Sequence, residues 1–216
     1  MKKNEMKVVI LAAMGKEVAP LEQALPGEII VGTGVGKVAA AAATERTILL
    51  EKPDAIVFVG IAGALAPELK TLSVVVAREA AQWDVDLTVI NNTLPGTLND
   101  GRQFIALDAH GSGLALKAAQ SLGYQTILGR IVSGDSFLSD SGKATWLRQT
   151  FQADAVEMEG AAALQIADDH KIPMVLIRVI SDGAGDDAAG TYTDFMHEAA
   201  SRAAKVVAAF LPAWRG

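Results

Sequence analysis

Short apolar runs rich in β-branched residues recur along the chain, and each is too short for a buried helix. Continuous apolar runs of this length are typical of strands buried on both faces of a parallel sheet. The predicted strands cover Lys7–Ala13, Glu28–Val31, Ala55–Val59, Leu72–Ala77, Thr126–Val132, Ala153–Val156 and Met174–Ile180.

Segments with a helical pattern lie between most of these runs. They cover Lys16–Leu25, Gly36–Glu51, Leu107–Leu122, Ser141–Phe151, Met158–His170 and Thr191–Phe210. Lys52-Pro53 and Gly123 provide stop signals, because the residue before Pro disfavours the helical region and Gly readily follows a helix end. The alternation predicts an α/β fold, a three-layer α/β/α sandwich around a central mixed, mostly parallel sheet.

The segment Leu87–Asp108 breaks this alternation. It is polar and contains Asn91-Asn92, Pro95-Gly96 and Asn99-Asp100-Gly101. A long irregular segment in a compact domain is more often a functional loop or a subunit contact than a linker. No repeat or domain boundary interrupts the pattern, so residues 1–216 are predicted to form a single domain.

Composition and charge exclude several function classes. Half of the 216 residues are hydrophobic and the formal net charge is −6. Nucleic acid and membrane partners are not expected, because both favour basic surfaces and no basic run follows Lys2-Lys3. The absence of Cys and the presence of only three His argue against disulfides and a zinc site. The apolar run Val8–Met14 is followed by charges without a cleavage site, so we expect a cytoplasmic protein without a signal peptide.

Glycine, hydroxyl and carboxyl residues gather where the predicted strands end, which is where open α/β sheets bind ligands. The strand ends lead into Met14–Glu17, Gly32–Lys37, Gly60–Gly63, Ser133–Phe137, Glu157–Gly160 and Ser181–Gly183. The glycines at 32–36 match neither the dinucleotide fingerprint nor the phosphate loop, and they could form only tight turns.

Two carboxylates stand at the junction of a buried strand and a helix. Glu157 or Glu159 could be only a charge at the helix N-terminus, and the same holds for Glu17 in its own helix. The functional interpretation is that Glu159 points into the crevice and accepts hydrogen bonds from paired hydroxyls, such as those of a ribose.

Charged residues also fall in and after the last predicted strand. Arg178 lies among apolar residues, where a charge needs a partner, and Glu17 or Glu159 are the candidates for an ion pair. Asp182 could cap a turn before a glycine. A partly buried acid beside the hydroxyl of Ser181 also suits a general acid.

These motifs, in this order and at compatible spacing, resemble those of the methylthioadenosine/S-adenosylhomocysteine nucleosidases, within the nucleoside phosphorylase superfamily. The resemblance covers nearly the whole chain and is strongest over Ala12–Met14 with Glu17, Gly34–Ala40, Gly60–Pro67, Val132–Phe137, Val156–Glu159 and Ile177–Asp182. It implies hydrolysis of the bond between a purine and a ribose, with no cofactor and no metal.

The resemblance implies four catalytic residues. Asp182 would protonate N7 of the purine and Ser181 would orient that acid. Glu17 would hold and activate the attacking water, supported by Arg178. An acid at the leaving group and a base at the water are the two carboxyl roles of an inverting glycosidase.

The resemblance also implies the substrate-binding residues. Glu159 would hold the ribose diol, Met158 would pack on the sugar, and Phe137 would stack on the purine. The backbone of Leu138 would contact the edge of the purine, while Val35 and Tyr192 would face the group at the 5′ carbon. The complete predicted binding set is Val35, Ile61, Ala62, Phe137, Leu138, Glu157, Met158, Glu159 and Tyr192.

The chain departs from the family pattern in ways that leave the 5′ group open. Ile61 stands where Ser is common, Trp83 where His is common and Tyr192 where Phe is common, and the segment Leu25–Glu28 is short. The open alternatives are a hydrolase of futalosine, aminofutalosine or adenosylhopane.

Two further alternatives differ in the chemistry. A phosphorylase would need basic groups around phosphate, but Phe58 replaces an Arg found in bacterial phosphorylases and Glu17 would repel the anion. A nucleoside-binding protein without catalysis would need neither an acid nor a base. We therefore predict a hydrolase of a small-molecule purine nucleoside. Because dimers are common in this family, we also predict a homodimer, with Leu87–Asp108 at the contact.

Overall fold

The computed structural model describes residues 5–216, and Lys2 and Lys3 lie outside this range. One sheet of eight strands forms its centre. The strands are β1 (Val8–Ala12), β2 (Ile29–Gly32), β3 (Ala55–Ala64), β4 (Val74–Gln82), β5 (Ile105–Ala106), β6 (Thr126–Ser133), β7 (Ala155–Glu157) and β8 (Met174–Asp182).

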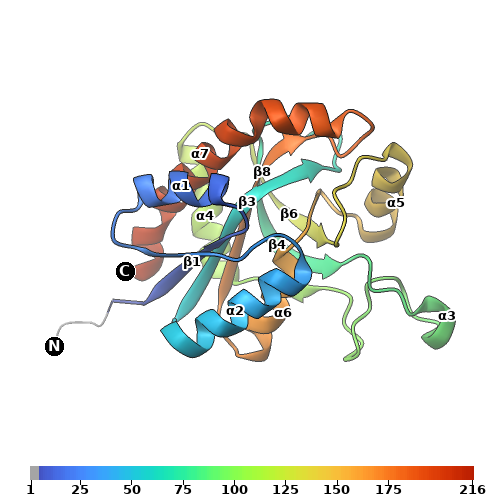
Figure 1. Ribbon diagram of the computed structural model, residues 1–216, viewed down its shortest axis with the longest axis horizontal. Coiled ribbons are helices and arrows are strands. Elements are labelled where there is room, and N and C mark those ends of the chain that lie inside the picture. Colours follow the sequence, from blue (N-terminus) through green and yellow to red (C-terminus); the bar gives the residue numbers. More distant parts are fainter. Residues whose placement is uncertain (1–4) are drawn as a thin grey trace.

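Helices cover both faces of the sheet (Figure 1). They are α1 (Gly15–Ala24), α2 (Lys37–Glu51), α3 (Thr88–Asn91), α4 (Ala109–Ser121), α5 (Ser141–Phe151), α6 (Gly160–Asp169) and α7 (Ala188–Arg215). The layer of α1, α4 and α7 packs on one face, while α2 and α6 pack together on the other. The predicted three-layer α/β/α arrangement is therefore confirmed.

The sheet is mixed and mostly parallel, as predicted. Strands β2, β1, β3 and β8 run parallel in that order, and so do β4, β6 and β7. The two groups join through antiparallel pairs, β8 with β4 and β3 with β7. Strands β3, β8, β4, β6 and β7 therefore close into a ring of hydrogen-bonded neighbours, a barrel-like closure that the apolar runs did not predict.

The core is split between the two faces because successive side chains of a strand point to opposite sides. On β8, Val175, Ile177 and Val179 pack under α4 and α7. Met174 and Leu176 belong to the opposite cluster, under α6. Both faces are apolar, which explains why the strands read as continuous apolar runs.

Several boundaries differ from the predictions, and α7, for example, covers Ala188–Arg215 instead of Thr191–Phe210. Strand β3 continues to Ala64 instead of ending at Val59, because the small residues after Gly60 remain extended and pair with β7 and β8. Strand β4 begins at Val74, after Leu72 adopts a left-handed φ of 70°. The segment Leu87–Asp108 is not wholly irregular, since it contains α3 and β5.

No helix within residues 5–216 is both long and apolar enough to cross a membrane.

Candidate active site

A cavity of about 570 Å³ opens where β1, β3, β7 and β8 end. Its volume falls within the range typical of small-molecule sites. The lining residues are Ala13, Met14, Glu17, Val35, Ile61, Ala62, Gly63, Ser136, Phe137, Leu138, Val156, Glu157, Met158, Glu159, Ser181, Asp182, Ala189, Tyr192 and Thr193. The structure thus brings together every predicted site residue except Arg178, which is buried below the cavity.

The carboxylate of Glu17 is held by backbone donors at the start of α1. One oxygen accepts hydrogen bonds from the N–H groups of Ala13 and Met14, at 3.1 and 2.9 Å, and the other accepts from Ile61 N–H at 3.1 Å. Burial raises the pKa of Glu17, while the positive charge of Arg178 and these N–H donors oppose the rise. Glu17 is therefore a fixed carboxylate with raised basicity.

Strand β3 makes room for this carboxylate. A Cβ atom added to Gly60 would lie 2.6 Å from Oε1 of Glu17, which is too close for any side chain. A Cβ atom on Gly63 would lie 2.9 Å from Oδ1 of Asp182. The two glycines of the Gly60–Gly63 motif thus allow two carboxyl groups to approach the same strand.

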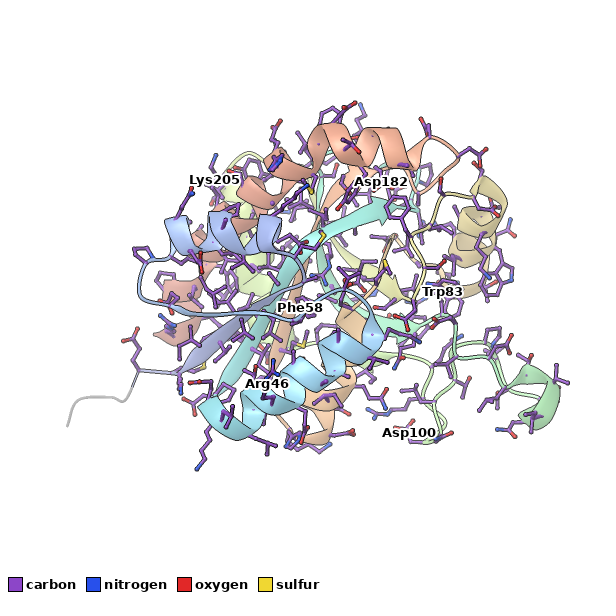
Figure 2. The ribbon with its side chains drawn as sticks, viewed as in Figure 1. Arg46, Phe58, Trp83, Asp100, Asp182 and Lys205 are labelled. Atoms are coloured by element: carbon purple, nitrogen blue, oxygen red, sulfur yellow. The ribbon has the colours of Figure 1, made fainter. Side chains whose placement is uncertain are left out.

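Asp182 ends β8 and lies beside the N-terminal part of α7 (Figure 2). Its oxygens accept hydrogen bonds from the Ser181 hydroxyl and from Ala184 N–H, both at 2.8 Å. Ala184 is buried and has a left-handed φ of 53°, which directs its N–H back to the carboxyl. Burial is the main cause of the raised pKa of Asp182, and the two hydrogen bonds oppose it. A raised pKa favours the protonated form that a general acid requires.

Glu159 stands at the N-cap of α6 and reaches across to the turn after β2. Its Oε1 accepts a hydrogen bond from Gly36 N–H at 2.8 Å, where Gly36 has a φ of 93° that favours glycine. Burial and the neighbouring charge of Glu157 raise the pKa of Glu159 to about 7. The carboxyl is therefore close to half protonated at neutral pH.

The ion pair of Arg178 differs from the prediction. Its guanidinium bonds Glu157, with Nη2 at 2.6 Å and Nε at 3.2 Å from Oε2, and not Glu17 or Glu159. It also lies 4.6 Å above the ring of Phe58, which Figure 2 shows within the sheet. The strand order explains the choice, because β7 and β8 both pair with β3 and this brings Glu157 close to Arg178, a proximity that sequence spacing does not reveal. Arg178 is buried, with 1% of its surface exposed, and does not line the cavity.

Apolar side chains form the rest of the wall. The rings of Phe137 and Tyr192 meet edge to face with centroids 5.6 Å apart, and the Tyr192 hydroxyl lies 3.5 Å from the sulfur of Met14. Phe137 and Val35 are each about half exposed, as suits residues at the mouth of a cavity. Met14, Ser136 and Thr193 also line it and were not predicted, although Met14 and Ser136 lie inside the motifs that were.

The lining is acidic and contains no Lys or Arg among the residues that the structure describes. Across residues 5–216, no three His, Asp or Glu side chains are grouped so as to hold a metal ion. Phe58, the residue that argued against a phosphorylase in the sequence, is buried away from the cavity. The arrangement offers an acid, a base and a third carboxyl around one space, and a poor environment for a phosphate anion.

Comparisons with known proteins agree with this geometry. A model of the phosphorylase superfamily matches residues 27–212. The aminodeoxyfutalosine nucleosidase of Campylobacter jejuni is 32% identical, over 94% of this chain and 96% of that protein. The 5′-methylthioadenosine/S-adenosylhomocysteine nucleosidase of Tolumonas auensis is 34% identical, over 95% and 99%. A Helicobacter pylori structure of such an enzyme, with 5′-methylthioadenosine in its active site, has a TM-score of 0.92 at 27% identity and covers 96% of this chain and 99% of its own.

The fold and the site define an enzyme of the purine nucleosidase class, which cleaves N-glycosidic bonds by hydrolysis. The chain belongs to the phosphorylase superfamily, and within it resembles the methylthioadenosine/S-adenosylhomocysteine nucleosidases.

Proposed function

We propose that the protein hydrolyses 5′-methylthioadenosine, S-adenosylhomocysteine or both, releasing adenine. The observation that carries the proposal is the placement of Glu17, Glu159 and Asp182 around one cavity whose lining, among residues 5–216, includes no Lys or Arg. An acid and a base on a single cavity are what hydrolysis of a glycosidic bond requires.

In this mechanism Asp182 protonates N7 of the purine, so that the base leaves as a neutral molecule. Its raised pKa keeps a proton available, and the hydrogen bonds from Ser181 and Ala184 fix the carboxyl in place. General acid catalysis of this kind contributes about 10²–10⁴-fold in rate.

Glu17 binds and activates the water that attacks the sugar. Its three backbone donors leave the carboxylate fixed but able to accept a proton. Arg178 is not at the cavity, so it supports Glu17 through its positive charge, which opposes the raised pKa. Breaking the bond develops positive charge on the sugar, which the neighbouring carboxylates stabilise.

The remaining residues hold the nucleoside. Glu159 binds the ribose hydroxyls and Met158 packs on the sugar. Phe137 stacks on the purine and the Leu138 backbone contacts its edge. Val35, Ile61, Ala62 and Tyr192 then face the sugar and the group at its 5′ carbon, all of them on the cavity wall.

Aminodeoxyfutalosine is a second candidate substrate. The Campylobacter jejuni relative carries that name, and the Tyr192 hydroxyl offers a polar group whose one side-chain partner is a weakly accepting sulfur. A substrate with a polar 5′ substituent would give this hydroxyl a stronger partner. The roles of Asp182 and Glu17 are the same for either substrate.

A homodimer is also part of the proposal. Val89 and Ile90 on α3 are 99% and 80% exposed, and Figure 1 shows α3 projecting from the body of the molecule. Exposed apolar groups on a projecting segment are typical of a protein contact.

We also propose a cytoplasmic location, which agrees with the absence of Cys from the sequence.

The deciding experiment is a base-release assay on methylthioadenosine, S-adenosylhomocysteine, aminodeoxyfutalosine, futalosine and inosine, each with and without phosphate. Phosphate-independent release of adenine from the first two supports the proposal. Release only from another nucleoside would reassign the substrate, and dependence on phosphate would refute hydrolysis.

A further inference from the structure

Three buried residues form a bracket beneath Glu159: Ser133 at the end of β6, Glu157 at the end of β7 and Arg178 on β8. Ser133 and Glu157 are register partners in the parallel β6–β7 pair. The Ser133 hydroxyl donates to Oε1 of Glu157, and the Arg178 guanidinium donates to Oε2. Ser133 and Arg178 are at most 1% exposed, and neither lines the cavity.

The bracket binds the start of α6. Glu157 accepts the N–H groups of Glu159 and Gly160, at 3.2 and 2.8 Å, and Ser133 Oγ accepts Ala161 N–H at 2.8 Å. The first N–H groups of a helix have no partner within the helix, so side chains must satisfy them when they are buried. The backbone position of Glu159 is therefore set by the bracket.

The carboxylate of Glu157 has no capacity left for a substrate. A carboxylate offers about four lone-pair sites, and the oxygens of Glu157 already accept from Ser133, Arg178, Glu159 and Gly160. Glu159, in contrast, accepts one hydrogen bond, from Gly36, among residues 5–216. The two carboxyls of the motif therefore have different tasks: Glu157 is committed to the protein and Glu159 is available to a ligand.

We propose that Ser133, acting with Glu157 and Arg178, is a positioning residue that fixes Glu159 for its hold on the ribose. The assignment rests on the proposed function of Glu159. It changes the predicted roles of two residues, since Glu157 positions Glu159 instead of contacting substrate and Arg178 anchors Glu157. Ser133 becomes a functional residue although it does not line the cavity.

Steady-state kinetics of Ser133→Ala test the proposal. We expect KM for the nucleoside to rise roughly tenfold, the effect of about one lost charge-assisted hydrogen bond, with a smaller loss of kcat because Glu17 and Asp182 lie on other elements. Ser133→Cys, which keeps a weak donor, should fall between the wild type and Ser133→Ala. It also serves as the second variant if Ser133→Ala does not fold, as judged by thermal unfolding.

The matched control is Ser112→Ala. Ser112 is a buried serine on α4 whose hydroxyl donates to Ala77 O at 3.1 Å, away from the cavity. Its removal should lower the melting temperature but leave KM and kcat unchanged.

A double-mutant cycle separates the positioning of Glu159 by Ser133 from a general loss of stability in the variant. In a Glu159→Gln background, Ser133→Ala should change KM less than about twofold, because residues that act through one contact are not additive.

A second readout does not depend on activity. Glu159 faces the charges of Glu157, Arg178 and Glu17, and its pKa is about 7. Without the Ser133 hydroxyl, the start of α6 is less firmly held and Glu159 shifts relative to Gly36 and Glu157, the neighbours that set its pKa, so the pKa of Glu159 should change in Ser133→Ala and stay in Ser112→Ala. Carbon-13 NMR titration of labelled glutamate carboxyls, assigned with Glu159→Gln, measures it.

The two failures are distinguishable. If the wild type releases no base from any nucleoside, the proposed function fails, while the titration still shows whether Ser133 controls Glu159. If folded Ser133→Ala keeps the wild-type KM and the Glu159 titration, or if its effect adds in full to that of Glu159→Gln, the bracket is only structural and the inference is overturned.

Discussion

The three cavity carboxyls differ in their partners, and the differences suit different tasks. Glu17 accepts three backbone N–H groups, which stabilise its charge. Asp182 accepts a hydroxyl and one N–H, and its pKa is raised by burial. Glu159 has one backbone donor and a carboxylate neighbour. Burial raises the pKa of all three carboxyls, so their hydrogen-bond partners, and not the direction of the pKa shift, distinguish them.

The acid role proposed for Asp182 predicts the effect of Asp182→Asn. The amide cannot deliver a proton to the purine, so kcat should fall by about 10²–10⁴-fold. The fold should persist, because the amide oxygen still accepts from Ala184 N–H. The control is Asp194→Asn on the exposed face of α7, which should leave kcat unchanged. Turnover and thermal unfolding of both variants provide the measurement, and undiminished turnover in Asp182→Asn would remove the assignment.

The raised pKa of Glu159 predicts how stability depends on pH. Its pKa is about 7 in the folded protein against 4.5 for an exposed glutamate, so between these values the folded state binds more protons than the unfolded state. This contribution to stability is complete below pH 4.5 and is lost as pH rises through about 7. Glu159→Gln removes this effect. Its free energy of unfolding, relative to that of the wild type, should therefore rise by roughly 2–3 kcal/mol between pH 4.5 and pH 7.

Urea unfolding at intervals from pH 5 to pH 8 measures this difference. Glu22→Gln, at an exposed position on α1, is the control and should differ from the wild type by the same amount at every pH. A constant difference for Glu159→Gln as well would mean that Glu159 titrates normally in the folded protein.

At the residue scale, the sequence identified the cavity residues but not all their partners. Every site residue that the family resemblance implied, except Arg178, lines the cavity, and most of them follow the ends of neighbouring strands. The partner of Arg178 could not be predicted, since Glu157, Glu159 and Glu17 all lie at strand ends. Only the pairing of β7 and β8 with the same strand, β3, brings Glu157 to Arg178.

At the scale of elements, β3 contributes to the site because it carries two glycines where a side chain would crowd the carboxyl groups. Gly60 and Gly63 remain within the strand and give the space that Glu17 and Asp182 occupy. Glycine weakens a strand interior, so its presence where backbone and side chains approach closely indicates a site. The motif was recognised from the sequence, but it was expected to end the strand, because glycines more often mark turns.

Gly60→Ala tests this requirement. The added methyl would lie 2.6 Å from Oε1 of Glu17, so the carboxylate must move away from Ile61 N–H. We expect kcat to fall by about 10²-fold and the free energy of unfolding to fall by about 1–3 kcal/mol. Gly113→Ala on α4 is the control, since nothing lies within 4 Å of its Cβ position. It should stabilise by about 0.5–1 kcal/mol and leave kcat unchanged. Equal activity of the two variants would show that Glu17 does not need its present position.

The regular elements were predicted well because both faces of the sheet are apolar, and helix α5 begins and ends where the pattern placed it. Strand β5 has two residues and α3 has four, too few for any periodic pattern. The closure of the sheet through β8 and β4 depends on pairing between distant segments. Such pairing follows from packing in three dimensions and leaves no local signal in the sequence.

At the scale of the whole molecule, the closed ring of strands, with β1 beside β3, places the ends of β1, β3, β7 and β8 around one cavity. The mouth of this cavity carries exposed apolar groups, Val35 and Phe137. Segment 87–108 carries further exposed apolar groups on α3, at a distance from the sheet (Figure 1). Exposed apolar surface of this kind is costly for a monomer in water, and the proposed homodimer would cover it.

The proposed homodimer leads to a prediction for α3. Ile90→Asp places a charge on this projecting apolar surface, where burial in a contact between two copies would leave the charge unpaired. The wild type should therefore have a dimer mass by light scattering at micromolar concentration. Ile90→Asp should shift towards the monomer mass while its melting curve stays cooperative.

Leu122→Asp, at a 41% exposed position after α4, is the control and should keep the dimer mass. A monomeric wild type would refute the dimer, whereas a dimeric Ile90→Asp would move the contact away from α3. If the contact also completes the cavity mouth, Ile90→Asp should have a higher KM than the wild type, because its monomer would lack part of the wall.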